Sequence, residues 1–392
     1  MSAEVEIVGA GPAGLAAALA VTRAGGPAIV YEASAEVGSR FHGDFQGLEN
    51  WTTTGDVLDE LAALGIEPGF EYRAFHECLF FDAAGRDYSV RSQQPLWYQV
   101  RRGPEPGSLD QALKQQALTA GVKICFNTPR HHLPAGGIVA HGPRRIDAVA
   151  TGYLFETDSA DGAYAAVSDR LAPGGYAYLL VWGGRGTIAT CQFADFHNSK
   201  EYAERTVDFF RDKVGLKMAA PRPFGGFGNL YTGQAVRKGH LLYAGEAAGF
   251  QDALFGFGLR YAMLSGHMAA SAWLGGRPET YDLLCRKRFS RSLKLAVVNR
   301  YLYQGFGDRG YAKLVRTLHA TADPRAWLRR YYGSGHVRQL VYPFARRRIM
   351  KKVELVTGCK EGCDCTWCRC HHALQERTEH DPGCRPQVGG DS

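Results

Sequence analysis

Three glycines near the N-terminus constrain the fold more than any other feature of the chain. Gly9, Gly11 and Gly14 follow an alternating apolar run that predicts a buried strand at residues 4–8, and small apolar residues after Gly14 predict a helix. In this setting the first glycine permits a tight turn, the second lets the backbone approach a pyrophosphate, and the third lets helix and strand pack closely. A second strand is expected at residues 28–32. The pattern predicts a dinucleotide-binding βαβ unit.

An acidic residue completes this motif. Glu32 ends the second expected strand, 18 positions after Gly14, where a carboxylate accepts hydrogen bonds from a ribose hydroxyl. Pro12 and Ala13 open the helix, whose N-terminus attracts phosphate. The expected cofactor contacts in this part of the chain are Gly9, Gly11, Pro12, Ala13, Gly14 and Glu32. The motif by itself does not separate FAD from NAD.

The N-terminal motif resembles the start of FAD-dependent oxidoreductases of the glutathione-reductase-like and hydroxybenzoate-hydroxylase-like type. The second FAD motif of these proteins has a counterpart in residues 239–250, with Gly245 followed by Glu246. The resemblance implies that the acidic residue binds the ribityl chain of FAD. Most members carry Asp where this chain has Glu246, so the direct contact is open.

The stretch that follows is similar to the geranylgeranyl reductase family. In that family a Gly-x-Gly turn, here Gly256 and Gly258, lies against the isoalloxazine, and Leu259 begins a helix of small residues. Residues 173–178, Pro-Gly-Gly-Tyr-Ala-Tyr, resemble the strand that walls the substrate pocket. The segment from Tyr98 to Leu113 resembles a strand-to-helix segment that implies Arg101 as an FAD contact.

Three departures from the family pattern affect the substrate and the catalytic residues. The family's Ala-Asp-Gly motif corresponds to residues 147–152, which lack it, and a common Pro is Ala253 here. The Cys-Gly pair of many reductases is absent from residues 38–44, where Arg40 is a candidate FAD contact instead. We therefore expect no catalytic cysteine.

The resemblance implies an α/β fold with a doubly wound, Rossmann-like FAD-binding domain. We expect the inserted substrate domain to be an antiparallel sheet, because further strand patterns cluster together, including a hairpin across residues 82–87. The expected segments are 1–70, 100–160 and 238–280 for the FAD-binding domain, 71–99 and 161–237 for the substrate domain, 281–356 for a helical C-terminal region, and 357–392 for a Cys-rich tail.

Reduction of a carbon–carbon double bond requires hydride from the flavin and a proton from a second group. Tyr176, Tyr178 and His42 are candidate donors, and each is equally well explained as a packing residue. Aromatic side chains that could line an apolar pocket are Trp182, Phe224, Phe227 and Phe255. They favour an isoprenoid or another apolar small molecule as substrate. The alternatives are an FAD-dependent monooxygenase acting on a small aromatic compound, and a non-catalytic flavin or metal electron-transfer protein.

The tail is dense in soft metal ligands: Cys359, Cys363, Cys365, Cys368 and Cys370 precede two histidines. Thiolate and imidazole suit zinc or an iron–sulfur cluster; the alternative is a redox-active or disordered thiol tail. A cluster could pass electrons to the flavin. No second glycine motif follows a strand, so a separate nicotinamide domain is not expected. The electron donor is left open between NAD(P)H and an electron-donor protein such as reduced ferredoxin.

The net charge of +7 is concentrated late in the chain, at residues 286–288, 329–330, 346–348 and 351–352. Such clusters suit an anionic membrane surface, a phosphorylated substrate or an acidic partner protein; the alternative is a solvated helix face. No nucleic-acid motif accompanies the charge, so no nucleic-acid partner is expected. The sequence has no long apolar run and no basic, then apolar, N-terminus. We expect a cytoplasmic protein, with contact to the cytoplasmic face of a membrane as a further possibility.

Overall fold

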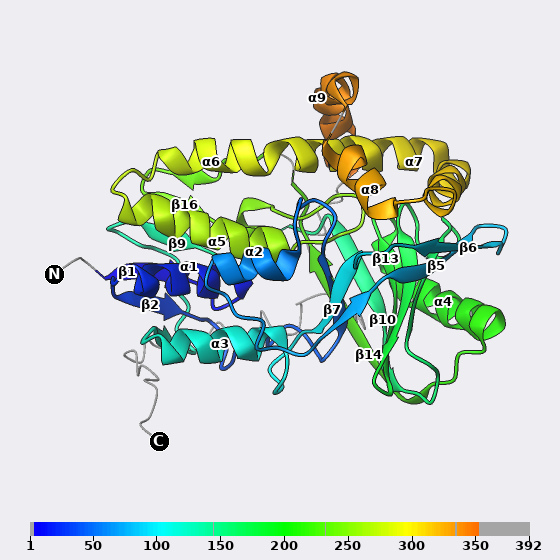
Figure 1. Ribbon diagram of the computed structural model, residues 1–392, viewed down its shortest axis with the longest axis horizontal. Helices are drawn as coiled ribbons and strands as arrows, with labels where there is room; N and C mark the ends of the chain where they lie inside the picture. The colour runs from blue at the N-terminus through cyan, green and yellow to red at the C-terminus, as the bar shows by residue number, and fades with distance from the viewer. Residues whose placement is uncertain (1–3, 144, 232, 334, 353–392) are drawn as a thin grey trace.

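The computed structural model describes residues 4–143, 145–231, 233–333 and 335–352. Figure 1 shows two regions side by side, one built on a parallel sheet and one on a mainly antiparallel sheet, with the last helices lying across both. The helices are α1 (Pro12–Arg23), α2 (Val57–Ala63), α3 (Leu109–Thr119), α4 (Ser199–Val214), α5 (Leu259–Leu274), α6 (Thr280–Arg288), α7 (Ser290–His319), α8 (Pro324–Gly333) and α9 (His336–Lys352).

The first sheet has the doubly wound form that the resemblance implies. Its described strands run in the order β15-β16-β9-β1-β2-β8, and only the β15–β16 pair is antiparallel. The strands are β1 (Val5–Val8), β2 (Ala28–Tyr31), β8 (Lys123–Cys125), β9 (Gly137–Val139), β15 (Arg237–Lys238) and β16 (Leu241–Tyr243). Segments around residues 5–31, 123–139 and 237–243, which are distant in the sequence, therefore share one sheet.

The second sheet carries the predicted hairpin and the strands that follow it. Its described strands run β14-β10-β13-β12-β11-β5-β6, all antiparallel except the β5–β11 pair. The strands are β5 (Glu77–Asp82), β6 (Asp87–Arg91), β10 (Ala148–Glu156), β11 (Gly162–Val167), β12 (Tyr176–Trp182), β13 (Arg185–Gln192) and β14 (Ala219–Gly228). The boundary expected at residue 160 falls between β10 and β11, two strands of this sheet.

A short third sheet joins the two regions. It consists of β3 (Phe45–Glu49), β7 (Trp97–Arg101) and β4 (Tyr72–Phe75), with β7 in the middle. The backbone N–H of Phe45 at the start of β3 donates to Thr187 Oγ1 in β13 at 3.0 Å. The third sheet therefore fixes the antiparallel sheet relative to the segments that precede α2 and α3.

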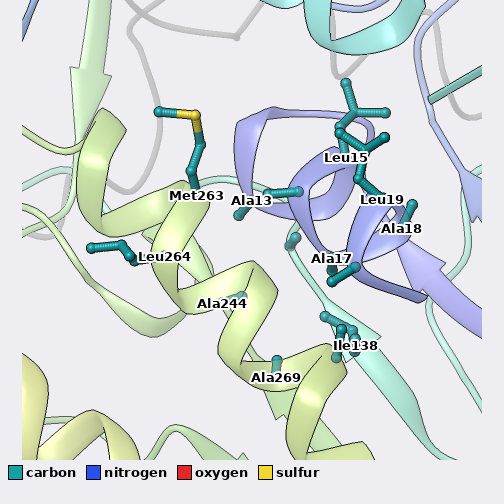
Figure 2. Close-up of a cluster of buried hydrophobic side chains, with 14 of the residues drawn as sticks. Ala13, Leu15, Ala17, Ala18, Leu19, Ile138, Ala244, Met263, Leu264 and Ala269 are labelled. Carbon is teal, nitrogen blue, oxygen red and sulfur yellow. The ribbon is translucent and has the colours of Figure 1, made fainter. Parts of the chain in front are cut away.

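Helices α1 and α5 lie against each other over the parallel sheet (Figure 2). Their contact is made by small residues: a Cβ atom added to Gly266 in α5 would lie 2.0 Å from the carbonyl oxygen of Ala13 in α1. Only glycine permits this approach, because real Cβ atoms essentially never come so close to a backbone oxygen. This packing places the N-terminal part of α1 directly against α5, the helix that follows the second motif.

Helices α6 to α9 form the predicted helical C-terminal region. Helix α7 is bent at Gly307, whose φ of 53° and ψ of −147° are not helical. Buried residues of α7, α8 and α9, among them Tyr303, Tyr332 and Ile349, share a core with Trp51 and the antiparallel sheet. The C-terminal helices thus cover the side of the molecule where the two sheets meet.

Candidate functional site

A tight glycine turn leads into the N-terminus of α1. Gly9 has φ of +95°, and a Cβ there would lie 2.4 Å from the carbonyl oxygen of Ala140. A Cβ on Gly14 would lie 1.9 Å from the carbonyl oxygen of Gly9, so both glycines are required by the packing of the turn. Gly11 differs, because an added Cβ would meet nothing within 4 Å. Gly11 is the N-cap residue of α1.

Glu32 lies at the carboxyl end of β2, beside this turn. Its Oε2 accepts a 2.7 Å hydrogen bond from the N–H of Ala10, and its Oε1 accepts one of 2.9 Å from the N–H of Ser34. The glycine turn and the acidic residue are therefore held together, as the sequence predicted from their spacing. Pro12 and Ala13 lie in the first turn of α1, directly after the open position at Gly11.

The second motif meets the first through Gly245. Its N–H donates to Ser265 Oγ at 2.9 Å, and a Cβ there would lie 2.8 Å from the Cβ of Ala13. The next residue, Glu246, forms a 3.0 Å ion pair with Arg40. Three of the predicted cofactor contacts, Gly245, Glu246 and Arg40, are thus brought to the start of α1 from distant parts of the chain.

The two arginines at the end of β7 have different surroundings. Arg101 forms a 3.1 Å ion pair with Glu71 and also donates to the carbonyl of Pro106. Arg102 is buried, donates twice to Asp110 at 2.8 and 2.9 Å, and stacks over the ring of Phe41 at 4.0 Å.

Burial works against the charge of Arg102, but the attraction and hydrogen bonds of Asp110, together with Asp44 and Glu246, outweigh it and raise its pKa. Arg102 therefore adds a fixed positive charge near Glu246. Arg101, the predicted FAD contact, stays a prediction.

The loop before α5 is shaped by a buried carboxylate. Asp252 accepts hydrogen bonds from the N–H groups of Leu254 and Phe255 at 3.1 and 2.7 Å, and from the hydroxyl of Tyr332 at 3.0 Å. Burial raises its pKa to about 6, against the lowering effect of these bonds and of Arg300. The carboxylate fixes the turn that leads into Gly256 and Gly258, the latter being the N-cap of α5 with Leu259 as its first residue.

Arg300 on α7 holds the same loop from the other side. Its guanidinium donates to the carbonyls of Ala253, Leu254 and Gly174, with a 2.7 Å bond from Nε to Ala253. It is fully buried and lies over the ring of Phe193 at 3.6 Å. One side chain therefore links the Gly-x-Gly loop to the Pro-Gly-Gly turn before β12.

Aromatic side chains gather next to the Gly-x-Gly turn. The ring of Trp51 lies 4.7 Å from that of Phe257 and 6.3 Å from those of Phe255 and Tyr332, centroid to centroid. Tyr176 lies 6.3 Å from Phe255 and donates its hydroxyl to the carbonyl of that residue. The residues between and beside the two glycines are thus set in an apolar, aromatic environment.

The three candidate proton donors are not equivalent. Tyr176 and Tyr178 are neighbours on β12, 6.1 Å apart between ring centroids. Burial raises the pKa of both hydroxyls; Cys191 adds to this at Tyr176, and Asp44 at Tyr178. His42 is exposed, in the loop before β3.

The four aromatic residues predicted to line a pocket do not form one group. Phe255 belongs to the cluster at the Gly-x-Gly turn, and Phe224 packs with Tyr178. Trp182 instead lies 5.6 Å from the ring of Phe45, and Phe227 packs in a separate small cluster with Val149. The apolar environment of the turn is therefore built in part from residues other than those predicted.

The predicted metal ligands, Cys359, Cys363, Cys365, Cys368 and Cys370, lie outside the described residues. Within the described part of the chain, no group of three or more His, Cys, Asp or Glu side chains is placed to hold a metal ion. The zinc and iron–sulfur hypotheses for the tail therefore stay predictions.

Several residues of the site were missed by sequence reasoning: Trp51, Arg102, Asp252, Phe257 and Arg300. Two carried a local signal. Asp252 is an acid shortly before a Gly-x-Gly turn, and Arg300, with Asn299, interrupts the apolar run from Leu295 to Tyr303. A charged residue in such a run is buried at a cost unless it is paired, which marks it as a structural or functional contact.

The fold and the glycine turns define the class: the chain has the fold of FAD-dependent flavoproteins of the geranylgeranyl reductase and hydroxybenzoate hydroxylase type. Neither the models of known protein families nor the sequences of curated proteins match this chain. The likeness is found instead among solved structures, and it concerns the fold.

A geranylgeranyl bacteriochlorophyll reductase-like protein from Thermoplasma acidophilum is similar to this chain with a TM-score of 0.68 at 17% identity, over 89% of this chain and 99% of that one. A flavin-dependent brominase matches with a TM-score of 0.59 at 14% identity, over 89% and 99%. The p-nitrophenol 4-monooxygenase of Pseudomonas putida matches with a TM-score of 0.54 at 14% identity, over 89% and 98%.

Proposed function

We propose that this chain is an FAD-dependent oxidoreductase that reduces carbon–carbon double bonds of an isoprenoid or another apolar small molecule. The observation that carries the proposal is the aromatic cluster of Trp51, Phe255, Phe257 and Tyr332 at the Gly256–Gly258 turn. Ligand sites for apolar molecules are lined mainly by apolar and aromatic side chains of this kind. Likeness in fold to a reductase-like protein from Thermoplasma acidophilum supports the same reading.

The residues at the start of α1 fit FAD. The open space at Gly11 leaves room for a pyrophosphate, and the helix N-terminus supplies N–H groups and a favourable dipole. Glu32 would accept from a ribose hydroxyl, and the Arg40–Glu246 pair would meet the ribityl chain and phosphates. When bound, FAD supplies the hydride chemistry, and the protein supplies orientation and the proton.

Reduction of a double bond adds a hydride to one carbon and a proton to the other. Tyr178 is the donor that we favour. Its hydroxyl is protonated at neutral pH, because burial raises a pKa that is ordinarily about 10. Burial also makes it a weaker acid, so the preference depends on its place beside Tyr176 on β12, 6.1 Å away between ring centroids. The hydroxyl of Tyr176 already donates to the carbonyl of Phe255, which suits a positioning role at the turn. His42 is exposed in the loop before β3 and lies outside this pair of tyrosines.

A second candidate is an FAD-dependent monooxygenase acting on a small aromatic compound. The likeness in fold to p-nitrophenol 4-monooxygenase favours it, and aromatic side chains at the turn would also stack on an aromatic ring. Either NAD(P)H or reduced ferredoxin could serve as the electron donor. A third possibility, a non-catalytic electron-transfer protein, would bind FAD without substrate-dependent turnover.

Anaerobic absorption spectroscopy of the purified protein tests the proposal. Flavin bands, release of FAD on denaturation, and reoxidation of the reduced protein by an isoprenoid alkene without oxygen are expected. Absence of flavin, even after FAD is added, would contradict the proposal. Reoxidation that requires oxygen together with an aromatic substrate would establish the monooxygenase instead.

The tyrosine assignment has its own control. Tyr178→Phe should slow anaerobic reoxidation by roughly 10²-fold or more, the usual contribution of a positioned proton donor. The matched variant Tyr164→Phe, on the neighbouring strand β11, should leave the rate unchanged. Equal rates for Tyr178→Phe and the wild type would remove Tyr178 from the mechanism and leave the FAD proposal intact.

A further inference from the structure

Helix α9 has apolar side chains on two different sides. Ala345 and Ile349 are buried in the core that α9 shares with α7 and α8. Val337, Leu340 and Phe344 are instead 77%, 81% and 49% exposed. Their spacing of three and four residues aligns them in one stripe along the helix. We call this stripe, together with Arg347 and Arg348 at its end, the outer face of α9.

An exposed apolar stripe of this kind is expected to bind an apolar partner. A helix that is apolar on more than one side is normally buried on each of these sides, and contiguous exposed apolar residues with a polar rim mark a site of interaction. Leu340 and Val337 are the two most exposed large apolar side chains of the described chain. Figure 1 shows α9 standing out from the body beyond α7, where a flat surface can reach it.

The charge around the stripe indicates which partner. From Pro324 to Lys352 the chain has nine Arg and Lys residues and no Asp or Glu. Arg347 and Arg348 are exposed, and the guanidinium of Arg348 lies 5.3 Å from the centre of the Phe344 ring. Apolar side chains flanked by arginines are the composition of helices that lie in the headgroup region of anionic bilayers. A second copy would instead bring like charges together.

We infer that the outer face of α9 docks on an anionic lipid bilayer. Val337, Leu340 and Phe344 enter the boundary between headgroups and acyl chains, while Arg347 and Arg348 contact lipid phosphates. The helix lies along the surface and does not cross the membrane: within the described residues, no helix is sufficiently long and apolar for that. Docking here would bring α7, α8 and α9, which pack against the aromatic cluster, close to apolar molecules dissolved in the bilayer.

Co-sedimentation of the full chain with lipid vesicles tests the inference and needs neither FAD nor turnover. We expect binding to vesicles of phosphatidylcholine mixed with phosphatidylglycerol, little binding to phosphatidylcholine alone, and loss of binding at high salt. Val337→Gln with Leu340→Gln should weaken the partition coefficient about tenfold. Arg347→Gln with Arg348→Gln should weaken it about thirtyfold, since each charge near the surface contributes about 1 kcal/mol.

A charge-matched control is Arg211→Gln with Lys217→Gln, at the end of α4 and just beyond it, away from α9 (Figure 1). It should change binding less than twofold. The inference is overturned if anionic vesicles do not bind the wild type, or if the control weakens binding as much as the α9 variants. Sedimentation velocity adds a second check: a wild-type dimer that Val337→Gln with Leu340→Gln converts to monomer would make the outer face a self-contact instead.

Discussion

Arg300 on α7 and Ala253 in the loop before α5 are joined by a 2.7 Å hydrogen bond from the guanidinium Nε to the backbone carbonyl. With further bonds to the carbonyls of Leu254 and Gly174, this one side chain connects the helical region to both loops of the candidate site. Its position explains why an arginine is fully buried inside a largely apolar stretch of helix.

Arg300→Met should therefore destabilise the protein by about 3–5 kcal/mol, the usual cost of removing one partner of a buried charged network. Three carbonyls lose their donor, and Asp252 loses a positive charge that lowers its pKa. Urea unfolding measures the effect. Arg309→Met, an exposed arginine on the same helix, is the control and should change the unfolding free energy by less than about 0.5 kcal/mol. Similar values for the two variants would contradict the role assigned to Arg300.

Asp252 should make stability depend on pH. Its pKa in the folded protein is about 6, above the ordinary 3.8. The folded state therefore binds more protons between these values, and the unfolding free energy falls as pH rises from about 4 to about 6. The drop contributed by this group is at most about 3 kcal/mol. Asp252→Asn should flatten this part of the profile, which chemical unfolding at a series of pH values would detect. An unchanged slope would contradict the prediction.

Gly266 should be intolerant of any side chain. Gly266→Ala places a Cβ 2.0 Å from the carbonyl oxygen of Ala13, so α1 and α5 must separate. We expect a loss of about 1–3 kcal/mol, as for other overpacked cores. Gly305→Ala in α7 is the matched control, since its Cβ would meet nothing within 4 Å. It should stabilise by up to about 1 kcal/mol through helix propensity. Thermal unfolding of both variants measures these changes in stability.

Gly11 should separate folding from cofactor binding. Its added Cβ meets no protein atom, and its φ of −80° suits alanine, so Gly11→Ala should fold normally. The methyl group would occupy the space through which a pyrophosphate approaches the backbone, so FAD affinity should fall roughly tenfold or more. Gly14→Ala, whose Cβ would lie 1.9 Å from a carbonyl oxygen, should instead lose stability. Unimpaired FAD binding by Gly11→Ala would place the cofactor elsewhere.

The sequence predicted the parts of the fold that depend on local patterns. The βαβ unit, the hairpin of β5 and β6 and the helix that begins at Leu259 were recognisable because their signals lie within a few tens of residues. Strand β14 was missed because it carries two prolines, which a sheet accepts only at an edge, and three glycines, which weaken a strand pattern. Its edge position follows from pairings that sequence reasoning could not see.

The candidate site was predictable to a similar extent. Gly9, Glu32 and Gly245 come together as expected, because each belongs to a motif with its own spacing. The resemblance implied Arg101 as the contact, but the different surroundings of Arg101 and Arg102 could not be predicted from the sequence. Adjacent residues of a strand point to opposite faces, and the register that orients them depends on β3 and β4. Arg300 meets partners 47 and 126 residues away, a contact that no local pattern encodes.

The close packing of α1 on α5 has a consequence for synthesis of the chain. Ala13 leaves the ribosome about 250 residues before Gly266, which at 5–20 residues per second is an interval of roughly 13–50 s. During that interval the alanine-rich surface of α1 lacks the helix that covers it. Nascent chains halted before α5 should therefore be clients of chaperones, and an N-terminal fragment ending there should be degraded in the cell.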